Sequence, residues 1–355
     1  MCLFTDKLQL CTGILTVTLP RSDRLGALLL CALLLLGGCA TVRHDPLPSW
    51  SDGPARQAIV DFVHQTTDAA SPQFVPPARR IATFDQDGTL WVEQPMYAQV
   101  MFALDRVKDV VRAKPALASE EPFKAVVTGD RAAMAKFTEG DLLKIVAASE
   151  AGLSVEEFHD VVRRWLATAK HPKFQRPYTE LVYAPMVEAM RYLRANGYRT
   201  YIVTGGGQEF VRAFADEVYG IPPEQVVGTM LKIDYAFRDG QPALIHAPEL
   251  FFINDKAGKP VGINMIIGRR PQAAFGKSDG DRQMLEWATA SGGARLGMIV
   301  LHDDAAREYA YGPADGLPES KVGTFTPALY DEAKKKGWSV ISMKRDWKRV
   351  FAFEP

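Results

Sequence analysis

The stretch at residues 79–95, RRIATFDQDGTLWVEQP, carries the strongest functional signal in the chain. Its apolar run, 81–84, is typical of a buried strand and ends in Asp85 and Asp87, followed by Gly88. In sheets of parallel strands, ligands bind beyond the carboxyl ends of the strands. Two carboxylates directly after a strand are therefore candidates for a functional site. The alternative is a surface turn, because Asp-Gly is common in turns.

Length and charge limit the possible functions. The chain has 355 residues, enough for one large or two modest domains. Its apolar fraction of 47% and charged fraction of 24% predict an ordinary globular protein. The formal net charge of zero provides no global field that would attract nucleic acid, so we expect no nucleic-acid partner.

The first forty residues form a distinct leader. Arg21 and Arg24 precede an apolar run at 25–36 that is too short for a comfortable membrane span and is typical of a signal peptide. The run ends in Leu-Gly-Gly-Cys39, which resembles the lipobox of bacterial lipoproteins. The resemblance implies a lipid on Cys39 and attachment to a membrane on the periplasmic side of the cell envelope, expected to be the outer membrane. An ordinary signal peptide or a membrane anchor is the alternative.

The leader sets the expected boundaries of the mature chain. We expect a signal peptide at 1–38 and a lipidated tether at 39–54, since the latter is polar and contains prolines. All cysteines of the chain lie in the leader: Cys2, Cys11, Cys31 and Cys39. The body after residue 39 therefore has no disulfide, no thiolate metal site and no cysteine nucleophile.

The remaining sequence alternates between helical and strand patterns. A first helix is expected at 55–69, and the block from about Tyr97 to Trp165 is helical throughout, with a capping-box spacing at Ser154 and Glu157. From 185 onward, amphipathic helices alternate with apolar strands, and Asp239-Gly240 predicts a hairpin. Such alternation predicts an α/β fold with a mostly parallel sheet and right-handed crossovers.

Three later segments also follow predicted strands. Thr204 and three glycines, 205–207, follow TYIV, and glycines let backbone N–H groups approach an anion. Lys259 precedes a short helix expected at 260–268, with Lys256 as a competitor for any role. The segment GKSDGD, 276–281, follows QAAF and offers carboxylates of the kind that magnesium prefers.

These four elements, taken in order, resemble the haloacid dehalogenase-like phosphohydrolase superfamily. DQDGT matches its first motif, Thr204 the second, Lys259 the third and GKSDGDRQML the fourth. The helical block looks like the small cap of phosphoserine phosphatase-like members. The resemblance implies a Rossmann-like core at 55–92 and 180–355, with an all-helical cap at 93–179 inserted after the first strand.

The resemblance further implies phosphomonoester hydrolysis through an aspartyl-phosphate on a small phosphorylated substrate. Asp85 would be the nucleophile, and Asp87 would protonate the leaving oxygen and later activate water. This second aspartate favours phosphatase over dehalogenase chemistry, because a leaving halide needs no proton. The implied binding residues are Thr204, Gly205 and Lys259 for the phosphate, and Asp85, Asp87, Asp279 and Asp281 for Mg²⁺.

One position departs from the fourth motif. If Asp281 is its second aspartate, the first falls on Lys277, which cannot bind magnesium while charged. Either Asp279 and Asp281 supply the ligands and Lys277 lies at the rim, or the Lys277 ammonium weakens metal binding or activity. The alternative function is therefore a catalytically weak or inactive relative that binds a phosphorylated ligand or a protein partner.

Other polar residues receive weaker predictions. Glu93 and Tyr97, at the start of the helical block, are candidate substrate contacts. His302, followed by two aspartates, also comes after a strand and either adds to the metal site, as a ligand or by supporting the ligands, or forms a polar loop with a helix cap. Arg269 and Arg270 precede a strand, so we expect them at the opposite edge of the sheet, in solvent.

Overall fold

The computed structural model describes residues 45–354, and residues 46 onward form one compact unit. The predicted signal peptide at 1–38, the lipid site at Cys39 and the first part of the predicted tether lie outside the described residues. Among the helices of the described part, none is both long enough and apolar enough to cross a membrane.

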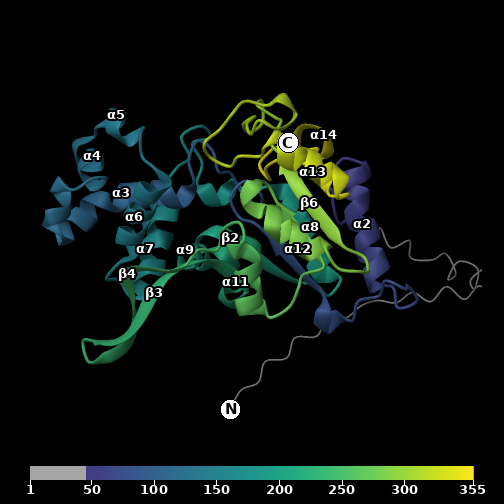
Figure 1. Cartoon of the computed structure of the whole chain (residues 1–355), viewed down its shortest axis with the longest axis horizontal. Coiled ribbons are helices and arrows are strands. Elements are labelled where there is room, and N and C mark those ends of the chain that lie inside the picture. Colours follow the sequence, from purple (N-terminus) through teal and green to yellow (C-terminus); the bar gives the residue numbers. More distant parts are fainter. Residues whose placement is uncertain (1–44, 355) are drawn as a thin grey trace, which may run out of the picture. The chain divides into compact units, whose positions relative to one another are not determined.

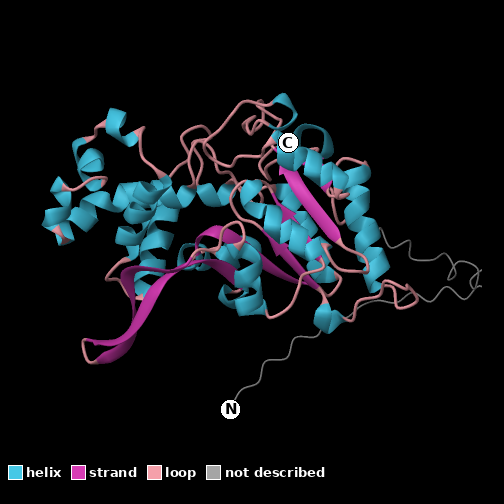
Figure 2. Ribbon diagram, viewed as in Figure 1, coloured by secondary structure: helices cyan, strands magenta, loops and turns pink. Residues whose placement is uncertain are grey.

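A seven-stranded sheet forms the centre of this unit (Figure 2). Its spatial order is β4-β3-β2-β1-β5-β6-β7, and every neighbouring pair is parallel except β3 and β4. The strands are β1 Ile81–Phe84, β2 Arg199–Gly207, β3 Val226–Arg238, β4 Gln241–Phe252, β5 Ala273–Gly276, β6 Leu296–Leu301 and β7 Ser339–Ser342. The predicted α/β class with a mostly parallel sheet is confirmed.

Alternating strand residues face two apolar layers, because successive side chains in a strand point to opposite faces. Phe84 and Phe275, from adjacent strands, stack with ring centroids 4.3 Å apart and pack toward α2 (Pro54–Thr67) and α8 (Ala184–Ala195). Residues on the other face pack against α11 (Gly258–Ile267), α12 (Arg282–Thr289) and α13 (Pro327–Lys335). Helices thus cover both faces, and β1 lies buried in the middle of the sheet.

A block of helices lies between β1 and β2 in the chain (Figure 1). It consists of α3 Ala98–Ala113, α4 Phe123–Thr128, α5 Arg131–Met134, α6 Glu139–Glu150 and α7 Val155–Thr168. The predicted capping box at α7 is confirmed, since Ser154 and Glu157 exchange hydrogen bonds of 3.1 and 2.7 Å. The block has a small core of its own, built around Ala103, Val107, Phe123 and Ile145.

The antiparallel pair β3–β4 extends from the sheet beside this block (Figure 1). Asp239 and Gly240 form its turn with φ of 52° and 76°, so the predicted hairpin is confirmed. A bridge joins Ser154 at the start of α7 to Ile245 of β4. The helical block is therefore joined to the β3–β4 hairpin. The predicted all-helical cap at 93–179 did not include these strands.

Two parts of the chain differ from the sequence prediction. The second half of the predicted tether is not free, because Leu47 and Trp50 are fully buried and the Trp50 indole donates to the Pro185 carbonyl at 2.8 Å. The sequence did not reveal these two apolar side chains, which are three positions apart, because prolines and serines lie next to them. The C-terminal segment adds α13, β7 and α14 (Met343–Asp346), for which we had no prediction.

Candidate active site

The loop after β1 is held in a tight conformation. The Asp85 N–H donates to the Phe275 carbonyl at 2.9 Å, which fixes where the strand ends. Gly88 has φ +70°, and a Cβ there would lie 2.5 Å from a Glu93 carboxylate oxygen. The Gly88 carbonyl accepts a 2.8 Å hydrogen bond from His302 Nε2. The loop thus requires glycine at position 88. His302, which we predicted could support the site, fixes the loop through this hydrogen bond.

Lys259 joins two carboxylates at the centre of the site. Its ammonium donates to Asp85 at 2.6 Å and also to Asp281, and its side chain is 2% exposed. Burial alone would lower the pKa of Lys259, but the charges of Asp281 and Asp85 raise it above its usual value. The lysine therefore stays charged, and one oxygen of Asp85 remains available for other chemistry. Lys256, the competing lysine, is exposed.

Asp87 lies beside this centre in a different environment. One of its carboxylate oxygens accepts a 2.7 Å hydrogen bond from the Trp91 indole. Burial, followed in the same direction by the charge of Glu93, raises the pKa of Asp87 to about 7. Burial, and next the charge of Asp281, also raise the pKa of Asp85, against the opposing effect of Lys259. The two aspartates of the motif thus differ in their partners: Asp85 is paired with an ammonium, whereas Asp87 accepts from an indole.

The carboxyl end of β2, where the pairing register shifts between Val203 and Gly207, approaches Asp87. The Thr204 hydroxyl accepts a hydrogen bond from the Gly206 N–H at 2.9 Å, so this predicted phosphate residue also shapes its own loop. A Cβ on Gly206 would lie 3.0 Å from the Gln99 side-chain oxygen and 3.9 Å from an Asp87 oxygen. Small residues here keep the backbone close to the aspartates. Gly205, Gly206 and Gly207 line the same cavity as Asp85 and Asp87.

The acids of the fourth motif, Asp279 and Asp281, do not turn toward the predicted Mg²⁺ site beside Asp85. The second oxygen of Asp281 accepts hydrogen bonds from the backbone N–H groups of Lys277 and Ser278, at 2.8 and 3.0 Å. Asp279 instead accepts from the N–H and hydroxyl of Thr326, at 3.1 and 3.0 Å. Neither aspartate lines the cavity that contains Asp85.

Lys277 is buried rather than at the rim. Its side chain is 1% exposed, and its ammonium pairs with Glu93 and donates to the Gly323 carbonyl. The ammonium also lies 4.2 Å from the centroid of the Tyr311 ring, and the Tyr311 hydroxyl donates to Glu93 at 2.7 Å. Lys277 thus ties Glu93 to the 320–326 loop.

These contacts bear directly on magnesium. Of the predicted ligands, Asp279 directs one oxygen to Thr326, and both oxygens of Asp281 accept hydrogen bonds, one from Lys259 and the other from backbone N–H groups. The stem of Lys277 passes Gly88, where a Cβ would lie 2.9 Å from Lys277 Cδ. Within residues 45–354, the His, Cys, Asp and Glu side chains form no group of three or more suited to a metal ion. The site as described does not fit the implied Mg²⁺, and no catalytic step is derived through it.

The cavity in front of Asp85 has a volume of about 670 Å³. Glu93 and Tyr97 line it, as the sequence suggested for substrate contacts. It also contains polar residues for which we had no prediction: Gln99, Glu150, Asp255 and Ser278. Of these, Asp255 follows β4, which runs antiparallel to β3, so the rule for the ends of parallel strands would have placed it at the opposite edge of the sheet. It reaches the cavity because β4 ends beside Met230, one residue after the Thr229 that pairs with Gly207. Helix packing brings Gln99 and Glu150 there.

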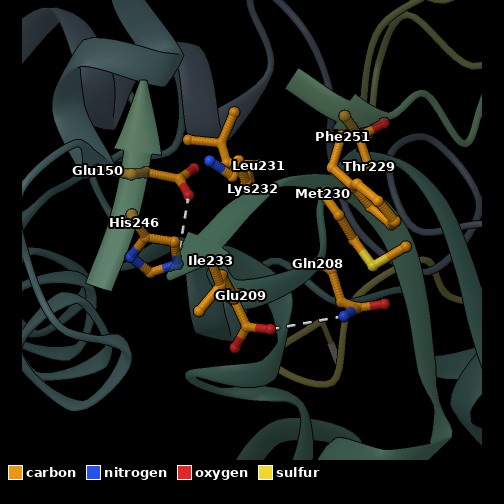
Figure 3. Close-up of a pocket in the computed structure, with 10 residues that line it drawn as sticks. All are labelled: Glu150, Gln208, Glu209, Thr229, Met230, Leu231, Lys232, Ile233, His246 and Phe251. Carbon is orange, nitrogen blue, oxygen red and sulfur yellow. Dashed lines mark hydrogen bonds and ion pairs between the residues drawn. The ribbon is translucent and has the colours of Figure 1, made fainter. Parts of the chain in front are cut away.

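A second cavity of about 290 Å³ adjoins the first and shares Glu150, Thr229 and Leu231 with it (Figure 3). Glu150 and His246 point toward each other in Figure 3, with 3.9 Å between the carboxylate and Nε2. Burial, and next the charge of Glu209, raise the pKa of Glu150 to about 8. Glu150 is therefore predominantly neutral at pH 7 where the two cavities meet.

Residues predicted away from the site lie away from it. Arg269 is exposed, and Arg270 packs over the Trp287 ring at 5.0 Å. Asp304, in the loop after β6, accepts hydrogen bonds from the N–H groups of Ala306 and Arg307. This is the capping role that we gave as the alternative to a role in the site.

The fold and the site together describe an α/β protein with paired carboxylates and a buried lysine at the carboxyl edge of a parallel sheet. Residues 82–255 match the family model for haloacid dehalogenase-like hydrolase. No curated protein sequence matches the chain.

Several solved structures are similar to the chain. A protein of unknown function from Anaerococcus prevotii shares 17% identity at a TM-score of 0.46, over 70% of this chain and 86% of its own. One from Bordetella pertussis Tohama I shares 19% at a TM-score of 0.45, over 74% and 98%. A phospho-aspartyl intermediate analogue of phosphoserine phosphatase shares 15% at a TM-score of 0.35, over 76% and 95%.

Proposed function

We propose that the chain is a haloacid dehalogenase-like phosphatase that hydrolyses phosphomonoesters through an aspartyl-phosphate on Asp85. The observation that carries the proposal is the arrangement of Asp85 on the Lys259 ammonium at 2.6 Å, with Asp87, whose pKa is about 7, lining the same cavity. The match of residues 82–255 to the hydrolase family supports it.

The first half-reaction transfers the phosphoryl group to the protein. The Asp85 oxygen that is not bound to Lys259 attacks phosphorus, and the bond from phosphorus to the leaving oxygen breaks. Asp87 gives its proton to that oxygen, so the product leaves as an alcohol. Lys259, Gly205 and Thr204, the residues implied by the family motifs, would contact the phosphoryl oxygens; of these, Lys259 and Gly205 line the cavity.

The second half-reaction restores Asp85. The Asp87 carboxylate takes a proton from water as that water attacks phosphorus, and the acyl-phosphate bond breaks to release inorganic phosphate. Asp87 is then protonated again for the next cycle. The Mg²⁺ requirement implied by the family stays a prediction for this chain, since the predicted ligand set is not assembled around Asp85.

The second candidate function is a weak or inactive phosphate binder, and it is favoured by Lys277, which occupies the position of an expected acid and pairs with Glu93. An aryl phosphate assayed with and without Mg²⁺, in wild type and Asp85→Asn, separates the two. We expect turnover by wild type and its loss in the variant. Negligible turnover by both proteins under both conditions would contradict the phosphatase.

The proposed substrate is a phosphorylated small molecule outside the cytoplasm. Attachment to a membrane through Cys39, on the periplasmic side of the cell envelope and in the outer membrane, is part of the proposal and rests on the leader sequence alone. Metabolic labelling with a fatty-acid probe tests it, with Cys39→Ser as the unlabelled control.

A further inference from the structure

The 670 Å³ cavity has two chemically different ends. Asp85, Asp87 and Lys259 lie at one end, together with the glycines at the carboxyl end of β2. Much of the remaining wall is apolar and comes from the helical block and the segment 231–253 that contains the β3–β4 hairpin: Val100, Leu117, Phe123, Leu142, Leu143, Val146, Leu231, Leu250 and Ile253. A phosphoryl group bound to Lys259 would therefore have an apolar space beside it.

This space is elongated along α6. Cavity residues run from Glu139, the first residue of the helix, to Glu150, the last. These twelve helical residues extend over about 18 Å, so the cavity is lined along the length of α6. Glu150 marks the catalytic end, because its carboxylate would lie 3.3 Å from a Cβ on Gly207. The cavity thus extends from the aspartates along the whole inner side of the helix.

The apolar wall is left open in the free protein. Leu143, Leu250 and Ile253 expose 39%, 46% and 49% of their surface, and all three line the cavity. Large apolar side chains that converge on a concave surface indicate a binding surface rather than scattered surface residues. The charged residues at the far end, Lys114, Glu139 and Lys144, are exposed and offer no buried partner to a polar substrate.

The lining near the aspartates also suits an apolar chain. Glu150, at the catalytic end of α6, is predominantly protonated at pH 7. A neutral carboxyl hydrogen-bonded to Gln99 at 3.4 Å repels neither a phosphate nor the hydrocarbon next to it. A small polar alcohol would leave the wall beyond Glu150 in water, whereas an elongated apolar alcohol would cover it.

We propose that the substrate is a phosphomonoester of a long apolar alcohol, an alkyl or isoprenoid chain, and not of a small polar alcohol. This inference rests on the proposed function for the reaction itself. The phosphate occupies the aspartate end, and the hydrocarbon lies along α6 against Leu143, Leu250 and Ile253.

A chain-length series tests the inference. Purified full-length protein is assayed with O-phosphoserine, butyl phosphate and octyl phosphate, all below the concentrations at which micelles form. Each added methylene that is buried should raise kcat/KM by up to about fourfold. We expect kcat/KM to be at least about tenfold higher for octyl than for butyl phosphate, with phosphoserine lowest. Equal values for butyl and octyl phosphate would overturn the inference and leave the phosphatase intact.

A matched pair of variants locates the effect. Leu143→Gln should lower the octyl-to-butyl ratio of kcat/KM by about tenfold, because it places an amide in the apolar wall. Leu244→Gln is the control: Leu244 is 45% exposed on the hairpin but does not line the cavity, so the ratio should not change. An unchanged ratio in Leu143→Gln, or equal losses in the two variants, would overturn the assignment of the chain to α6.

A binding measurement separates this inference from the reaction. If no phosphomonoester is hydrolysed, the proposed function fails, but calorimetry with non-hydrolysable alkylphosphonates still decides the binding question. Octylphosphonate binding at least about tenfold more tightly than butylphosphonate would support the apolar site. Equal affinity, or no binding of either, would overturn it.

Discussion

Replacing Lys277 by Met removes the ammonium that balances a buried carboxylate. Glu93 is 2% exposed, and after the change its charge keeps only the 2.7 Å hydrogen bond from Tyr311. Removing one partner of a buried ion pair costs about 3–5 kcal/mol, because the other charge is left uncompensated. We therefore expect the free energy of unfolding of Lys277→Met to fall by about that amount.

The double variant Lys277→Met/Glu93→Gln provides the matched control. It removes both charges, so its loss should be smaller than that of Lys277→Met, with a coupling of about 2 kcal/mol or more between the two positions. Urea unfolding of the two single variants and the double variant, followed by tryptophan fluorescence, measures this directly. A loss below about 1 kcal/mol in Lys277→Met, or no coupling, would refute the view that this pair holds the 320–326 loop.

Three further predictions concern the chemistry. Because Asp87 has a pKa of about 7 and acts as an acid, kcat/KM for an alkyl phosphate should fall as pH rises above about 7, and a flat profile from pH 6 to 8 would contradict this role. Lys259→Met should lose about 10²–10³-fold in turnover, while Lys256→Met, which changes an exposed lysine, should match wild type in the same assay. In a Glu93→Gln background, which removes the buried charge that the lysine balances, Lys277→Asp should raise Mg²⁺-dependent turnover at least about tenfold over Glu93→Gln alone, since it supplies the acid of the fourth motif. Equal Mg²⁺ dependence of these two proteins, titrated against EDTA, would count against Lys277 as the cause of the poor metal fit.

The parts of the site that follow strands could be predicted from the sequence. Asp85, Asp87 and the glycine loop each come directly after an apolar run, so the geometry of a parallel sheet brings them to one edge. The position of Lys259 at the start of a helix is local too, although only the structure shows that it joins Asp85 to Asp281.

The contacts that the sequence could not predict join distant segments through side chains. Lys277 and Glu93 are 184 positions apart, and nothing local to either residue indicates that the lysine turns away from Asp85 toward the 320–326 loop. Gln99 and Glu150 reach the cavity because α3 packs on α6. Strand β7 was missed because, unlike the equally short and fully buried β1, it has only two apolar residues, with a serine on each side.

The most direct test of the phosphatase account is to capture the phosphorylated intermediate. Wild-type protein mixed with an aryl phosphate, quenched in acid and digested should yield a phosphorylated peptide that contains Asp85. Asp85→Asn should yield none, and Asp87→Asn should accumulate the intermediate, because it lacks the base that activates water. Turnover by wild type without phosphate on Asp85, or undiminished turnover by Asp85→Asn, would contradict the account.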